Sequence, residues 1–132
     1  RTLQYQAAKR RMMSEVPTAD VVVTNPTHFA VALKYDQAKF RAPVVVAKGA
    51  DEVALMIRKI AEENKVPVLE SPMLARSVFY TTELEQPIPE QLFAAVAQVL
   101  AYVYQLNMFR KGKGKRPKAL AKDLPIPEEF RH

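Results

Sequence analysis

The tetrapeptide Asn25-Pro26-Thr27-His28 carries the sharpest candidate chemistry in the sequence. An Asn side chain usually cyclises when the backbone nitrogen of the next residue attacks the side-chain carbonyl, but Pro26 has no N–H and closes this route. The remaining route is attack by Asn25 Nδ2 on the Asn25 backbone carbonyl carbon. That attack forms a succinimide and expels the Pro26 nitrogen, so the chain is cut between Asn25 and Pro26 without an external nucleophile.

Geometry has to supply most of the acceleration of such a reaction, because an amide nitrogen is a poor nucleophile. A near-attack geometry contributes roughly 7–11 kcal/mol in favourable intramolecular reactions. His28 is a candidate for proton transfer or for a hydrogen bond that holds the turn, and Thr27 for a hydrogen bond to the local backbone. The alternative is an ordinary turn, since Asn-Pro is a common turn dipeptide and most such pairs never cleave.

Two short apolar runs flank this turn, at residues 20–24 and 29–36, and both have the composition of buried strands. Because only four residues connect them, we expect them to be antiparallel neighbours. The runs 44–47 and 66–69 predict two further strands, and Pro67 indicates either the beginning of the second of them or an edge position for it. Helices are predicted over residues 2–16, 51–64, 72–80 and 89–109.

This alternation of strands and helices predicts a small single-domain α/β fold. We expect a four-stranded, mostly parallel sheet whose first strand is antiparallel, flanked by about four helices, with a turn at residues 48–50. The predicted organisation is a linker helix over residues 1–18, an α/β domain over 19–109 and a basic, Pro-containing flexible tail over 110–132. The Lys- and Gly-rich start of the tail has too few apolar residues to bury.

The net charge of +6 on these 132 residues lies at the two ends of the chain. Residues 1–11 carry four basic and no acidic side chains, and residues 110–118 carry six basic and no acidic ones. Residues 12–109 hold 8 basic and 11 acidic side chains, so the predicted domain itself is mildly acidic. This distribution argues against a basic nucleic-acid-reading face on the domain, and it fits tails near an anionic membrane surface or solubilising ends.

Composition excludes several classes of site. The chain has no Cys, which removes disulfides, thiolate zinc sites and cysteine nucleophiles. His28 and His132 are the only histidines, so we expect no multi-histidine metal site and no cofactor. The apolar run 92–104 is shorter than the roughly 18 residues that span a bilayer. Because the sequence begins at Arg1 and has no signal peptide, we expect an excised piece of a longer protein.

Residues 20–36, centred on the Asn-Pro-Thr-His turn, resemble the signature of the FlhB/YscU family of type III secretion export-gate proteins. In that family this tetrapeptide cuts itself. The similarity continues in ordered blocks over residues 42–50, 62–70, 72–76, 88–100 and 123–127. The Ala-Lys-Gly sequence at 47–49 and the Pro-containing tail favour the flagellar branch over the injectisome branch.

The resemblance implies the cytoplasmic domain of a bacterial inner-membrane protein whose transmembrane part precedes residue 1. Its expected role is to switch export from rod- and hook-type to filament-type proteins, through one self-cleavage between Asn25 and Pro26 and no enzymatic turnover. The implied partners are export substrates, the export-gate cytoplasmic ring, a hook-length control protein and the membrane, and not nucleic acid. Lys9, Arg10 and Arg11 would lie near anionic headgroups, or on an ordinary solvated helix face.

Carried over by position, the family's substrate-docking patch consists of Ala42, Pro43, Ala97 and Leu100. Small residues there would leave a groove for a short hydrophobic peptide. The alternative is that Ala97 and Leu100 are ordinary core residues, because apolar stripes on helices usually face a core.

Two other function classes are compatible with parts of the sequence. A nucleic-acid- or membrane-surface-binding module would use the basic run 110–118, but this run has no interleaved aromatic residues for base stacking. A conventional hydrolase is disfavoured further, since the chain offers no Cys, two His and no Gly-x-Ser-x-Gly motif.

Overall fold

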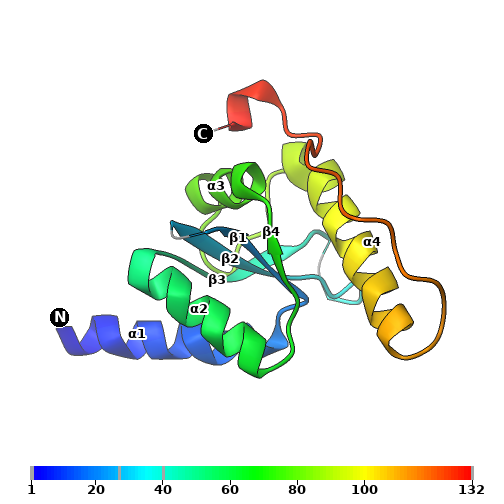
Figure 1. Ribbon diagram of the computed structural model, residues 1–132. Coiled ribbons are helices and arrows are strands. Elements are labelled where there is room, and N and C mark those ends of the chain that lie inside the picture. Colours follow the sequence, from blue (N-terminus) through cyan, green and yellow to red (C-terminus); the bar gives the residue numbers. More distant parts are fainter. Residues whose placement is uncertain (1, 27, 40, 132) are drawn as a thin grey trace.

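The computed structural model describes residues 2–26, 28–39 and 41–131, which form a four-stranded sheet covered by helices on both faces (Figure 1). The strands are β1 (Val21–Asn25), β2 (Phe29–Lys34), β3 (Val44–Ala50) and β4 (Val68–Glu70). The helices are α1 (Thr2–Glu15), α2 (Asp51–Glu63), α3 (Pro72–Thr81) and α4 (Phe93–Arg110). Short 3-10 helices occupy Val16–Thr18, Glu90–Leu92 and Glu128–Phe130.

The sheet has the strand order β3-β2-β1-β4, and its directions correct one part of the prediction. The α/β class, the four helices and the antiparallel pairing of β1 with β2 are confirmed. However, β2 also runs antiparallel to β3, while β1 and β4 are parallel. The strand of opposite direction is therefore β2 rather than β1, and the sheet has one parallel pair instead of being mostly parallel. The short loop 35–43 is the reason, since it returns the chain directly into β3 as a second antiparallel neighbour.

The strands contribute side chains to two separate hydrophobic cores, because successive side chains in a strand point to opposite faces. Val21 and Val23 of β1 join the core under α3 and α4. Val22, between them, joins the core under α1 and α2, where Met13 of α1 and Ile57 of α2 are also buried. The sheet is thus the middle layer of three, and β1 is buried on both faces.

Helix α4 packs along the sheet with one side only. By length and composition alone, residues 90–110 would suffice to cross a membrane. In this fold the helix instead buries Val96, Val99 and Val103 in the core that it shares with α3. Phe93 and Tyr104 lie beside this buried stripe and are 40% and 66% exposed. The helix is therefore a core element with two exposed aromatic side chains on one flank.

Strand β3 continues through residues 48–50, where the sequence predicts a turn. Gly49 explains the difference, because α2 approaches the sheet very closely there. A Cβ atom at Gly49 would lie 2.2 Å from Val53 Cγ1 and 2.7 Å from Val53 Cβ. The absence of a side chain at Gly49 therefore allows α2 to pack this closely against β3 and to begin directly after it.

We expect Gly49→Ala to lower the free energy of unfolding by about 1–3 kcal/mol, the usual effect of overpacking a filled interior. Urea denaturation monitored by circular dichroism measures the change. The double variant Gly49→Ala/Val53→Ala removes the colliding side chain and should lose less stability than the two single losses summed. Additive losses would contradict the close approach as the cause.

The C-terminal segment differs in part from the predicted flexible tail. Residues 111–116 are exposed, as a Lys- and Gly-rich run should be. Leu124 and Ile126 are only 4% and 5% exposed, and they belong to the core shared by α3 and α4. Ser77 Oγ of α3 also donates a hydrogen bond to the Phe130 carbonyl. The segment runs back along α4 to α3 (Figure 1), because its apolar residues complete the outer side of that core.

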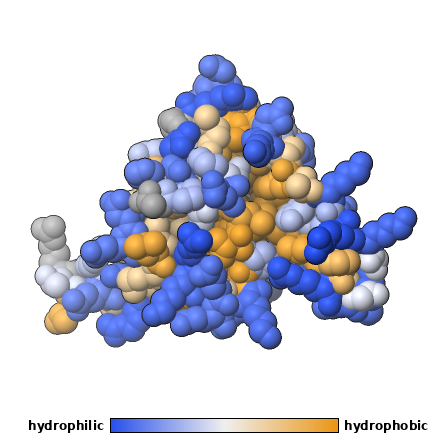
Figure 2. Space-filling model, viewed as in Figure 1, coloured by the Kyte–Doolittle hydropathy of each residue, from blue (hydrophilic) through white to orange (hydrophobic). Residues whose placement is uncertain are grey.

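On the face seen in Figure 2, hydrophilic side chains surround a hydrophobic middle. Edge strand β4 lies in this region in Figure 1, and its side chains Val68 and Leu69 are half-buried. Of the two positions that Pro67 indicated, the strand order confirms the edge, and the strand also begins directly after Pro67, at Val68.

Candidate functional site

The Asn-Pro turn lies at the end of the sheet where β1 passes into β2. Asn25 is the last residue of β1 and pairs with Phe29, the first residue of β2. Asn25 and Pro26 are half-buried, and His28 is exposed. Thr27, the fourth predicted site residue, lies outside the described residues. The structure thus brings Asn25, Pro26 and His28 together between two central strands.

Three backbone hydrogen bonds fix this turn to its surroundings. The His28 N–H donates to the Asn25 carbonyl oxygen at 2.9 Å. Before the turn, the Ser71 N–H at the start of α3 donates to the Thr24 carbonyl at 2.9 Å. After it, the Asp51 N–H at the start of α2 donates to the His28 carbonyl at 2.9 Å. The turn is therefore held at both ends by helix starts and across its middle by its own backbone.

The bond from His28 to Asn25 falls on the atom where charge would develop. Attack on the Asn25 carbonyl carbon would place negative charge on the Asn25 oxygen, and a fixed N–H donor at that position stabilises such an oxyanion. Mutational removal of one such donor from known enzymes costs roughly 2.7–4 kcal/mol in rate terms. The contact of His28 with this atom comes from its backbone N–H. Its imidazole ring is exposed and has its centroid 6.4 Å from that of Phe29.

A small hollow adjoins the Asn25–Pro26 bond on the α2 side of the sheet. Its lining includes Asn25, Pro26 and, from α2, Leu55 and Arg58, and its volume is about 10 Å³. That volume suffices for about one water molecule. The hollow is too small for a peptide substrate. Among the residues that the structure describes, no three His, Asp or Glu side chains gather closely enough to hold a metal ion.

An aromatic cluster beside the turn is a part of the site that the sequence did not reveal. The Phe29 ring lies 4.5 Å from that of Phe79 and 5.5 Å from that of Tyr80, measured between centroids. Both partners belong to α3, about fifty positions further along the chain. No local motif signals such a meeting, because it depends on the placement of β4 and α3 next to β1.

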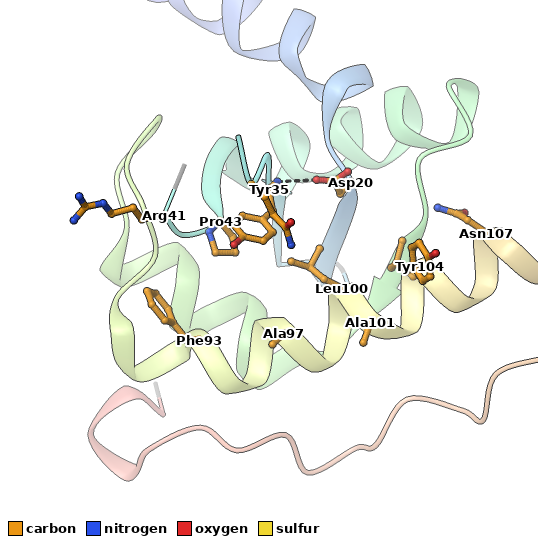
Figure 3. A pocket seen from close by; sticks show the side chains of 12 residues that line it. Asp20, Tyr35, Arg41, Pro43, Phe93, Ala97, Leu100, Ala101, Tyr104 and Asn107 are labelled. Atoms are coloured by element: carbon orange, nitrogen blue, oxygen red, sulfur yellow. Dashed lines mark hydrogen bonds between the residues drawn. The ribbon is translucent and has the colours of Figure 1, made fainter. Parts of the chain in front are cut away.

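A larger groove of about 520 Å³ lies between α4 and the loop that connects β2 with β3 (Figure 3). Three of the four predicted docking residues, Pro43, Ala97 and Leu100, line it. Ala42 does not line it and is buried, 6% exposed. Ala97 is exposed and Leu100 half-buried, so neither is a fully buried core residue.

The groove also has walls that were not among the predicted docking residues. In Figure 3, Tyr35 and Pro43 lie opposite Leu100, while Phe93 and Tyr104 lie towards the two ends of α4. The loop that carries Tyr35 is fixed by Asp20, whose Oδ2 accepts a hydrogen bond from the Tyr35 N–H at 2.7 Å. The sequence signal for these walls is the pair Phe93 and Tyr104 of the long helix, which lie at positions that the core does not use.

Comparison with known proteins places the chain in a family. The model of the FlhB HrpN YscU SpaS family matches residues 1–103. The flagellar biosynthetic protein FlhB of Salmonella typhimurium is 56% identical over 128 residues, which cover 97% of this chain and 33% of that protein. The flagellar biosynthetic protein FlhB of Bacillus subtilis is 54% identical over 102 residues, covering 77% and 28%. The chain therefore spans about a third of the length of the curated relatives it matches.

Solved structures agree with this assignment. The crystal structure of the cytoplasmic domain of FlhB from Shewanella putrefaciens matches with a TM-score of 0.91 and 51% identity, over 94% of this chain and 95% of that one. A mutated EscU C-terminal domain matches with a TM-score of 0.66 and 36% identity, over 68% and 90%. The fuller match is to the flagellar protein, as the tail and the sequence at 47–49 predicted. The chain belongs to the FlhB HrpN YscU SpaS family and corresponds to the C-terminal domain of a flagellar member.

Proposed function

We propose that this chain is the cytoplasmic domain of a flagellar type III export-apparatus component that switches export from rod- and hook-type to filament-type proteins. The switch depends on a single self-cleavage between Asn25 and Pro26. The domain is attached to the bacterial inner membrane by a preceding transmembrane part and works with the export-gate ring and the hook-length control protein. Membership of the family and the likeness to flagellar FlhB proteins support this role.

The proposed reaction needs no group from outside the turn except water. Asn25 Nδ2 attacks the Asn25 carbonyl carbon and loses a proton, while the bond from that carbon to the Pro26 nitrogen breaks and the nitrogen takes up a proton. Residues 1–25 then end in a succinimide, which water opens. The nucleophile acts once, so the domain performs no turnover.

The single observation that carries this proposal is the hydrogen bond from the His28 N–H to the Asn25 carbonyl oxygen, at 2.9 Å. It places a fixed donor where the oxyanion would form, next to a bond whose nitrogen belongs to proline. The neighbouring bonds from Ser71 and Asp51 hold both sides of the turn. Together these contacts supply the pre-organisation on which a slow nucleophile depends.

The groove between α4 and the β2–β3 loop is the proposed docking place for early export substrates. Pro43, Ala97 and Leu100 supply a shallow apolar floor, and Phe93 and Tyr104 are exposed at its ends. Grooves of this kind accept short apolar segments of a peptide. Its walls come from α4 and the loop before β3, so cutting the turn at the far end of β1 leaves them intact.

Mass spectrometry of freshly purified wild-type protein under denaturing conditions tests the cleavage. We expect two species whose masses correspond to residues 1–25 and 26–132. A folded wild-type protein that keeps its full mass of 14.9 kDa would refute self-cleavage. Circular dichroism of the same sample shows whether the protein was folded.

A further inference from the structure

Phe29 occupies the position directly opposite the proposed nucleophile. It pairs with Asn25 at the last rung of the β1–β2 ladder. Residues directly opposite each other in an antiparallel pair share a face of the sheet. The alternation that turns Val21 and Val23 towards α3 and α4 also places Asn25 and Phe29 on that face.

The Phe29 ring is fixed by two rings from the C-terminal half of α3. It contacts Phe79 at 4.5 Å with an interplanar angle of 31°, and Tyr80 at 5.5 Å with an angle of 75°. Phe79 and Tyr80 contact each other edge-to-face at 5.2 Å. Because each ring touches the other two, Phe29 is held from two directions, and Figure 1 shows α3 beside this end of β1 and β2.

Lys48 of β3 holds the end of α3 that carries these rings. It pairs with Val31 and therefore lies on the same face of the sheet as Phe29. Its Nζ donates a hydrogen bond to the Phe79 carbonyl at 2.9 Å and lies 5.1 Å from the centroid of the Phe79 ring. An ammonium group at the last carbonyls of a helix also interacts favourably with the helix dipole.

We propose that Phe29 is a positioning residue for cyclisation of Asn25, with Phe79, Tyr80 and Lys48 holding it in place. The inference rests on the proposed self-cleavage. The Asn25 carboxamide must turn back towards its own carbonyl carbon, and a fixed ring on the same face removes rotamers in which it points away. The cluster also keeps the first residue of β2 in register, so the Asn25 carbonyl stays at the His28 N–H.

The rate of cutting in Phe29 variants tests this role. The full 132-residue chain is made in a short cell-free synthesis, chased, quenched in denaturant at intervals and resolved by mass. We expect Phe29→Ala to cut about tenfold more slowly than wild type, since a lost near-attack geometry lowers the rate directly. Phe29→Tyr keeps the ring and should cut within about twofold of the wild-type rate.

A matched core variant separates positioning from stability. Val99→Ala removes two methyl groups from the core under α3 and α4, against which Phe79 packs, but on α4, which lies beside Asp20 before the start of β1. All rates are compared at a temperature at which circular dichroism shows each variant to be folded. We expect Val99→Ala to lower the melting temperature and leave the rate unchanged. If the cutting rate instead falls with the melting temperature across all variants, Phe29 acts only through the stability of the fold and the proposed positioning role is refuted.

Variants of Lys48 give a second test of the proposal, which holds even if the Phe29→Ala variant fails to fold. Lys48→Met keeps the aliphatic part of the side chain but removes the charge, and it should slow cutting several-fold. Lys48→Arg keeps the charge and should cut at close to the wild-type rate. A wild-type chain that never cuts refutes the proposed function itself. If the wild-type chain cuts, and folded Phe29→Ala and Lys48→Met chains cut at the same rate, only the positioning role is refuted.

Discussion

Replacing Asn25 by Ala is expected to leave every chain uncut, as one species at 14.9 kDa. The substitution removes Nδ2, the nitrogen that attacks the Asn25 carbonyl carbon in the proposed reaction. The side chain is half-buried at a strand end, so its truncation should cost little stability. Denaturing mass spectrometry after prolonged incubation gives the result. Continued cutting at the same bond would show that another nucleophile acts.

Three matched variants separate the parts of this chemistry. Asn25→Asp keeps the size and the hydrogen-bonding oxygen but removes the nitrogen, and it should also stay uncut. Pro26→Ala restores a backbone N–H, so deamidation competes and cutting should slow. His28→Ala should have the mildest effect, because the bond to the Asn25 carbonyl comes from the His28 backbone and the ring is exposed. A complete block in His28→Ala would assign the chemistry to the imidazole instead.

The cut protein is expected to remain one particle until it unfolds. Residues 1–25 contribute β1, whose Val21, Val22 and Val23 are all 0% exposed. Burial of each such side chain contributes roughly 1.5–3 kcal/mol. Hydrogen-bond ladders to β2 and β4 and the buried residues Met13 and Val16 add to this. Dilution alone should therefore not release the fragment.

Native size exclusion followed by denaturing gel electrophoresis checks this expectation. Both fragments should coelute in the native run and separate only after denaturation. In Val22→Ala, which leaves a cavity in the core under α1 and α2, release should occur at lower urea concentration. Loss of residues 1–25 from the folded wild-type protein in buffer would contradict the expected cohesion.

The sequence predicted most elements because their patterns are local. The β-branched run at 21–23 and the helix starts near Asp51 and Pro72 lie within a few residues of their predicted places. Three of the four docking residues also line one groove, although their shared position came from the resemblance rather than from periodicity.

What escaped prediction depends on contacts between distant segments. The direction of β3 was decided by the short loop before it, and strand patterns do not encode direction. The burial of Leu124 and Ile126 depends on a core that residues of α3 and α4 form only in the folded domain. The same holds for the meeting of Phe29 with Phe79, which requires β4 to lie beside β1.

The place of β1 in the strand order has one more consequence. Because β1 lies between β2 and β4, departure of residues 1–25 would expose two unpaired strand edges across a slot one strand wide. Open edges of this kind template pairing with any extended segment. Loss of the fragment and insertion of a foreign strand are therefore linked, since the vacated slot has the hydrogen-bonding groups and the apolar lining on both faces that a replacement strand needs.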